Sequence, residues 1–442
     1  MNCTSASPNI VSMKKNNSVK DKALLLYFPL AMLYQVLMMF YLDTHLVLPL
    51  QALTLLYGLW ALGRIKYNNN FKSIVVIFII YSILSVVFVI GSKLIDGFVY
   101  DVRVVILPMF TIFIGMWHDD NMFYKFFIYS VSFCMGLGLL LYLIRPGWYL
   151  SYLVDCYNNA WYNTSAVATE DNIMSGQLGW AYRFCGIYST PYAISYFATF
   201  ALCLLAVDIY REESTRLITK RWVQWVCFIV LALAAILCQN RVAMIYTVFI
   251  IAVALIYGIK VHNKARHFFT GLIVTVILVG TFIFIRYQND DFFVMLKETL
   301  SGRVEEMKLS NLENSSRSSQ IQITLKSWNN VPFGEGLGSR GGVARSLGAP
   351  GITDNGYIKL LVEQGVLGFC ILLVIFLKSA LRALRRYRLY AAELLMIGYV
   401  LFTLIGANTL GMSYDFMIIM WYAVGRIWNK KYLQTGTKYM IA

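Results

Sequence analysis

Apolar residues occur along this chain in runs of about 20, and polar residues gather between the runs. A run of that length is what an α-helix needs to cross the hydrocarbon core of a bilayer. We predict twelve membrane-spanning helices, at residues 23–41, 46–63, 73–91, 102–117, 122–144, 188–209, 222–239, 242–259, 267–286, 356–377, 390–409 and 412–428. The run at 102–117 is short, and Asp101 and Arg103 crowd its start. The pattern predicts an all-α polytopic membrane protein.

The predicted spans divide the chain into alternating membrane and polar segments. Two polar loops are large enough to carry structure of their own, and in the second one residues 292–309 and 315–328 each fit a short amphipathic helix near the surface. In order, the segments are an N-terminal tail (1–22), spans one to five (23–144), a first loop (145–187), spans six to nine (188–286), a large loop (287–355), spans ten to twelve (356–428) and a C-terminal tail (429–442).

Lysine and arginine are concentrated in every second connection, which indicates the cytoplasmic side of the membrane. Residues 378–388, for example, contain five basic and no acidic side chains. Both termini are then cytoplasmic, and the loops at 145–187 and 287–355 lie on the outer side of the membrane. This topology accounts for the net charge of +15. The expected partners of the basic residues are anionic lipid headgroups, and no nucleic acid is expected.

Composition supports the membrane class and argues against metal or cofactor chemistry. The chain is 59% hydrophobic and 14% charged, whereas a soluble domain is about 25% charged. No Walker A motif and no cluster of histidine with carboxylates is visible, so we expect no metal and no cofactor. The eight cysteines are scattered without a CxxC pair. Cys156 and Cys185 both fall in the first outer loop, where a disulfide or two buried thiols are both open.

Three arginines stand at the predicted outer ends of helices or in the outer loops. Arg183 precedes the sixth span, Arg241 lies in the short hinge between the seventh and eighth, and Arg317 lies in the large loop. Each could extend to the interface or pair with an acid, since an arginine at membrane depth costs roughly 2.5–3.5 kcal/mol on insertion scales. Converging guanidinium groups favour phosphate oxygens instead. A pyrophosphate is the expected anion on a membrane-anchored substrate.

A polar, glycine-rich stretch from Ser316 to Phe369 ends by entering the tenth span. Asp354 and Asn355 stand where the loop becomes a helix, and they fit either an N-cap or a site in which Asp354 accepts or orients the proton of a sugar hydroxyl. Lys359 and Glu363 are four residues apart on one helix face. They form an internal ion pair, or Glu363 supplies a second carboxylate to the site. The glycine run before them favours tight turns and close backbone approach.

Three local patterns resemble the superfamily of O-antigen polymerases and O-antigen ligases, which are bacterial inner-membrane proteins that handle undecaprenyl-pyrophosphate-linked glycans. They are Arg183-Phe-Cys-Gly-Ile-Tyr before an apolar span with Pro191 after it, Asn240-Arg241 opening a span, and a long loop with Arg317, Trp328, Pro332 and a glycine run before Asp354-Asn355-Gly356-Tyr357 and Glu363-Gln-Gly365. The patterns are confined to about 183–191, 239–245 and 317–368.

The resemblance implies a metal-independent glycosyltransferase of GT-C-like architecture, with its active site on the periplasmic face of the inner membrane. The donor would be a glycan on undecaprenyl pyrophosphate, and the acceptor a sugar hydroxyl of another lipid-linked oligosaccharide. By position, it implies pyrophosphate binding and neutralisation by Arg183, Arg241 and Arg317. Asp354 is the candidate general base by its place alone, and substrate contacts are expected from Asn355, Tyr357 and Glu363.

One departure separates the branches of the family. The ligases carry a histidine beside an asparagine where the long loop meets the next span, and here that position reads Asp354-Asn355. The departure favours a polymerase over a ligase that transfers glycan to lipid A core. A lipid-linked oligosaccharide flippase or other transporter is a further alternative. A chain-length regulator protein stays open as a partner, although no interface for it is readable.

Overall fold

The computed structural model describes residues 47–65, 70–118, 121–144, 146–160, 183–188, 191–211, 216–257, 328–340, 355–407 and 414–429, together with isolated positions elsewhere. Every regular element in these ranges is a helix, and none is a strand. The structure therefore agrees with an all-α membrane protein. The number of twelve spans and the GT-C-like architecture remain predictions.

The helices consist mainly of apolar residues, whose backbone groups are satisfied within each helix as a bilayer requires. A 3-10 turn, η2, extends α4, and a π-helical segment, η3, joins α5 to α6. In chain order the described elements are α3 (Val47–Arg64), α4 (Asn70–Leu84), η2 (Ser85–Phe88), α5 (Ile95–Asp101), η3 (Val102–Ile106), α6 (Leu107–Met109), α7 (Thr111–Trp117), α8 (Met122–Ile144), α9 (Gly147–Ala160), α11 (Pro191–Asp208), α12 (Arg221–Leu237), α13 (Arg241–Tyr257), α19 (Gly356–Arg385), α20 (Tyr387–Thr403) and α21 (Tyr414–Ile427).

Five helical segments are long and apolar enough to cross a membrane: Asn70–Phe88, Ile95–Trp117, Met122–Ile144, Pro191–Asp208 and Gly356–Arg385. Shorter apolar helices are Arg221–Leu237, Arg241–Ile256 and Phe416–Ile427. Ten of the twelve predicted spans overlap described helices. The other two, at 23–41 and 267–286, are described only at isolated positions.

The fourth helix of the predicted set begins earlier than the sequence indicated. It runs from Ile95 to Trp117, whereas the prediction began at 102 because Asp101 and Arg103 looked like a boundary. Asp101 instead lies inside the helix and is buried, since its carboxylate meets the Lys359 ammonium at 2.6 Å. A buried partner therefore lets a charged residue stand within an apolar helix.

Part of the first predicted outer loop is also helical. Residues Gly147–Ala160 form α9, which begins just after Pro146 and follows α8 closely. Pro146 accepts hydrogen bonds from the N–H groups of Tyr149 and Leu150 through its carbonyl, so it supplies the first turn without needing an N–H of its own. The described start of the loop, residues 146–160, is thus helical.

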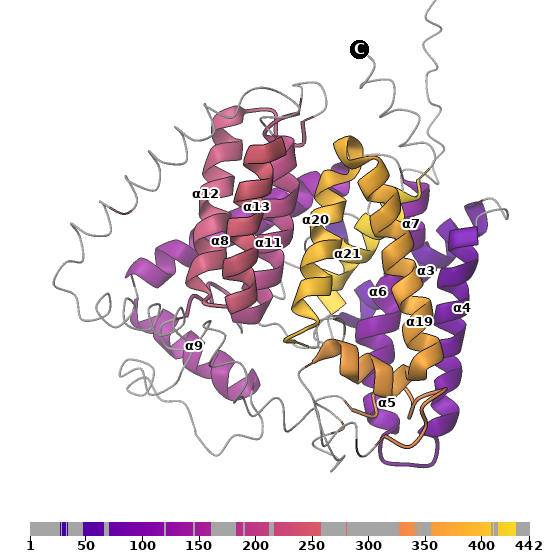
Figure 1. The fold of residues 1–442 in the computed structure, drawn as a ribbon. Coiled ribbons are helices and arrows are strands. Elements are labelled where there is room, and N and C mark those ends of the chain that lie inside the picture. The colour runs from indigo at the N-terminus through magenta and orange to yellow at the C-terminus, as the bar shows by residue number, and fades with distance from the viewer. Residues whose placement is uncertain are drawn as a thin grey trace, which may run out of the picture.

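Two groups of helices lie side by side (Figure 1). One group contains α8, α11, α12 and α13, the other contains α3, α4, α6, α7 and α19, and α20 and α21 lie between them. α9 and α5 lie at the same end of the assembly, at the bottom of the view. Between α7 and α21 the backbones approach closely because glycines face the contact: a Cβ atom at Gly115 or Gly425 would collide with a carbonyl oxygen of the other helix.

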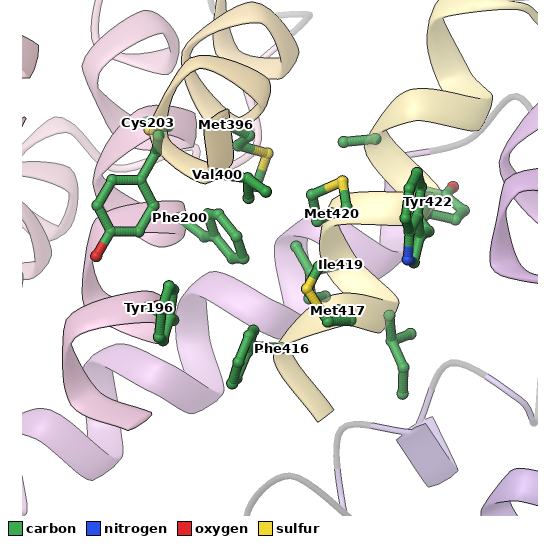
Figure 2. Close-up of a cluster of buried hydrophobic side chains, with 14 of the residues drawn as sticks. Tyr196, Phe200, Cys203, Met396, Val400, Phe416, Met417, Ile419, Met420 and Tyr422 are labelled. Atoms are coloured by element: carbon green, nitrogen blue, oxygen red, sulfur yellow. The ribbon is translucent and has the colours of Figure 1, made fainter. Parts of the chain in front are cut away.

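The core at the junction of α11, α20 and α21 is aromatic and rich in methionine (Figure 2). The ring of Tyr196 on α11 stacks on Phe416 of α21, with centroids 4.3 Å apart. Tyr399 of α20 contacts Tyr196 edge-on at 5.6 Å. These contacts join α11 of the first group to both central helices, α20 and α21.

Candidate functional site

The structure brings two of the three predicted arginine segments together. Arg183 begins a short turn that lies against the end of α12, where the Phe184 N–H donates to the carbonyl of Leu237 at 2.9 Å. Leu237 is the last residue of α12, and after three connecting residues the chain enters α13 at Arg241. The guanidinium group of Arg183 lies close enough to Cys238 of this hinge to interact with it electrostatically. Both arginine side chains are partly exposed.

The hinge between α12 and α13 is built around Asn240. Its side-chain oxygen accepts the N–H groups of Val242 (3.1 Å) and Ala243 (3.4 Å), which caps α13, and its Nδ2 donates to the hydroxyl of Ser195 at 3.2 Å. Gln239, just before it, has a φ of 51°, which non-glycine residues adopt infrequently. Arg241 is therefore the first residue of a helix, where the positive end of the helix dipole also favours an anion.

The segment that starts α19 is fastened to the end of α20. The Gly356 N–H donates to Leu404 O at 2.8 Å, and the Tyr357 hydroxyl donates to Leu401 O at 2.6 Å. Tyr399, one turn earlier in α20, donates to the carbonyl of Ser195, the residue that Asn240 also contacts. The hinge with Arg241 and the start of α19 therefore flank the same end of α20.

Asn355 is the N-cap of α19, as one of the two sequence interpretations held. Its Oδ1 accepts the N–H groups of Tyr357 and Ile358, each at 3.1 Å, and its Nδ2 donates to Ile405 O at 2.9 Å. Asp354 and Arg317 lie outside the described residues, so the general base and the third arginine stay predictions. Substrate contacts from Asn355 and Tyr357 also stay predictions.

Glu363 belongs to a buried group of charges. The Lys359 ammonium meets the Asp101 carboxylate at 2.6 Å and the Glu363 carboxylate at 3.4 Å, and all three side chains are at most 3% exposed. The ion pair between Lys359 and Glu363 is thus present, as the four-residue spacing indicated. Asp101 is the member that the sequence did not reveal, because it lies 258 residues away from Lys359. A contact of Glu363 with substrate stays a prediction.

The glycine run packs into a break in α19. Gly365 has φ 64° and ψ −180°, so it interrupts the helix, and Gly334, Gly336 and Gly338 also have positive φ. The expected tight turns and close approach are confirmed. Four backbone hydrogen bonds join the two segments: Glu335 N–H to Val362 O (2.9 Å), Gly336 N–H to Glu363 O (3.0 Å), Val366 N–H to Val331 O (3.0 Å) and Leu367 N–H to Pro332 O (3.2 Å).

Side chains close this junction on both sides. The Glu363 carboxylate accepts the Arg340 backbone N–H at 2.9 Å, while the Arg340 guanidinium pairs with Glu335 at 2.6 Å. From α4, the Tyr81 hydroxyl donates to the carbonyls of Phe333 (3.0 Å) and Gln364 (2.7 Å). The glycine run is therefore a rigid base for the large loop. Glu335 lies within the run and Arg340 just after Gly338, five residues further on, a spacing that the sequence interpretation did not use.

The described residues contain no group of three or more His, Cys, Asp or Glu side chains placed to hold a metal ion. Cys185 is buried, and the side chain of Cys156 lies outside the described part, so a disulfide between them stays untested. The described site places the guanidinium groups of Arg183 and Arg241 beside the N-terminus of α13, an arrangement that suits a phosphate-bearing ligand.

Residues 226–373 match a family model described as O-antigen ligase. The match extends from α12 through the Arg241 hinge and the large loop into α19, and it ends before the Lys378–Arg388 basic connection. Arg183 precedes the matched region. No curated protein matches the chain.

Proposed function

We propose that this chain, whose residues 226–373 match the family model described as O-antigen ligase, is a glycosyltransferase-like membrane enzyme of the O-antigen polymerase and ligase family, and that it is a polymerase of a surface polysaccharide. It joins undecaprenyl-pyrophosphate-linked oligosaccharide repeat units at the periplasmic face of the inner membrane. A sugar hydroxyl of one unit attacks the anomeric carbon of the other, the bond from that carbon to the pyrophosphate oxygen breaks, and undecaprenyl pyrophosphate leaves.

The observation that supports this proposal most directly is the contact between the Arg183 turn and the Arg241 hinge. Two guanidinium-bearing segments and the N-terminus of α13 meet at one end of the helix bundle. The leaving pyrophosphate gains negative charge as its bond to the sugar breaks, and fixed cations stabilise such charge most effectively where water is limited. We assign Arg183 and Arg241 to this leaving group, with Arg317 as a third ligand and without a metal ion.

The acceptor hydroxyl must lose its proton during the attack. Asp354 is the residue that we assign to accept it, since it directly precedes the capped N-terminus of α19. The same position distinguishes a polymerase from a ligase, because the ligases resemble this chain but carry a histidine there. The large loop of this chain, residues 287–355, contains no histidine at all.

Lipopolysaccharide from a deletion strain tests the polymerase assignment. If the chain is a polymerase, the strain caps its lipopolysaccharide with single repeat units, which a gel resolves as one band above the uncapped core. A ligase would leave the core uncapped, and polymer would accumulate on the lipid carrier. An unchanged long ladder would contradict both activities and favour a transporter or another role.

Arginine-to-lysine variants test the pyrophosphate site. Arg183→Lys and Arg241→Lys keep the charge but remove the two-pronged donor geometry, so we expect each to lower polymer formation about 100-fold. Arg221→Lys is the matched control, because Arg221 is exposed at the other end of α12. The measurement is polymer formed by purified protein from a defined lipid-linked repeat unit, with and without a chelator. Full activity of both site variants would refute the arginine assignment.

A further inference from the structure

The turn that carries Arg183 receives two hydrogen bonds from α9. The Tyr149 hydroxyl donates to Gly186 O at 2.7 Å, and the Tyr152 hydroxyl donates to Ile187 O at 2.6 Å. The two tyrosines are three residues apart, so they lie on one face of the helix. Both hydroxyl groups reach the backbone of residues 186–187.

On a second side, α8 packs against the same turn. Gly138 lies directly against the backbone of Gly186, so that even a Cβ atom at position 138 would be crowded by it at 2.7 Å. The Tyr142 ring meets the Phe184 ring edge-on, with centroids 5.5 Å apart. Gly186 itself has a φ of 58°, a conformation that a glycine adopts without cost.

On its third side the turn contacts the Arg241 hinge through the hydrogen bond from Phe184 to Leu237. The backbone immediately after Arg183 is therefore held by α8, by α9 and by the end of α12. Such support is more than a connecting loop requires. It is what a catalytic cation needs, because a guanidinium group lowers a barrier only when its position is fixed before the reaction.

We propose that Tyr149 and Tyr152 are positioning residues for the glycosyl transfer: their hydroxyl groups hold the Arg183 turn so that Arg183 and the Arg241 hinge are set for one pyrophosphate. This inference rests on the proposed function. It also gives the aromatic residues of α9 different roles. Tyr149 is 1% exposed and works inside the protein, whereas Trp148 is 63% exposed and has the character of an interfacial residue.

The test is Tyr149→Phe with Tyr152→Phe, which removes two hydroxyl groups and keeps both rings. Tyr129→Phe is the matched control, because Tyr129 is exposed on α8. With purified full-length protein and a lipid-linked repeat unit, we expect the double variant to lose about 10-fold to 30-fold in kcat, and the control to lose nothing. Thermal unfolding of the same preparations shows whether the variants remain folded.

A double-variant cycle that combines the two tyrosine substitutions with Arg183→Lys shows whether the tyrosines act through Arg183 or only stabilise the fold. If the tyrosines act through Arg183, adding the double substitution to Arg183→Lys lowers the remaining activity by less than about twofold. The same loss in both backgrounds, or full activity of the double variant, would overturn the inference while leaving the arginine site intact. Full activity of Arg183→Lys would overturn the arginine site and this inference together.

If Arg183→Lys has too little activity for the cycle, a second measurement tests the inference instead. Cys185 lies in the same turn and is buried. Under reducing conditions we expect a maleimide to label Cys185 several-fold faster in the double variant than in the unchanged protein or in Tyr129→Phe, as mapped by mass spectrometry of the peptides. Unchanged labelling of Cys185 would show that the hydroxyl groups do not hold the turn, and the inference would fail.

Discussion

At the scale of single residues, four glycines decide how the large loop attaches to the membrane helices. Gly365 breaks α19 with φ 64°, and Gly334 lies directly against it with φ 82°. A Cβ atom at either position would collide with backbone atoms of the other segment. Gly336 and Gly338 complete the run with the same left-handed conformation. At Gly334, Gly338 and Gly365 there is no room for a side chain because backbone packs on backbone.

We expect Gly365→Ala and Gly334→Ala each to lower the free energy of unfolding by about 3 kcal/mol. Roughly 1–2 kcal/mol comes from the left-handed conformation and the rest from overpacking. Gly63→Ala is the control, since nothing lies within 4 Å of its Cβ position in α3. The measurement is the thermal midpoint and yield of the detergent-purified protein. A midpoint unchanged in Gly365→Ala would show that the junction is more adaptable than its backbone contacts indicate.

At the scale of elements, the buried charges Asp101, Lys359 and Glu363 join α5 to the first part of α19. One ammonium group lies between two carboxylates, so removing it leaves two negative charges buried together. We expect Lys359→Met to cost about 3–5 kcal/mol of stability. Asp101→Asn combined with Lys359→Met should recover part of that loss, because one of the unpaired charges is then gone.

The same unfolding assay checks this prediction as a double-variant cycle. Lys125→Met is a suitable control, since Lys125 is exposed on α8. A loss in Lys359→Met that the second substitution deepens would mean that Asp101 stabilises the helices by some contact other than the ion pair.

The elements also show what a single sequence can predict and what it cannot. The apolar runs predicted most described helices, because a bilayer imposes a length and a composition on every span. Lys359 with Glu363, the cap at Asn355 and the glycine turns were predicted because each depends on near neighbours in the chain. Asp101 was taken for the boundary of a span because its partner, Lys359, is 258 residues away in sequence. The Tyr149 and Tyr152 contacts were missed because they join a loop helix to backbone atoms, which no residue pattern records.

At the scale of the whole molecule, α20 connects two chemically different ends of the bundle. It begins at Tyr387, beside the basic residues of 378–388, and ends at Thr403, beside the start of α19 and the Arg241 hinge. Its 17 residues span about 25 Å. A buried pair, Arg426 with Glu393 at 3.6 Å, lies towards its first end. The arginine site is therefore separated from the basic connection by most of a bilayer thickness.

This separation makes the orientation of the whole molecule testable with two exposed positions. Tyr387→Cys marks the basic end and Trp148→Cys marks the end with α9. Since lysine and arginine remain on the cytoplasmic side, we expect a membrane-impermeant maleimide to label Trp148→Cys in intact cells and Tyr387→Cys only after the inner membrane is opened. Labelling of the unchanged protein gives the background from its own cysteines. The reverse pattern would place Arg183 and Arg241 on the cytoplasmic face, where a periplasmic polymerase cannot use them, and the proposed function would have to be abandoned.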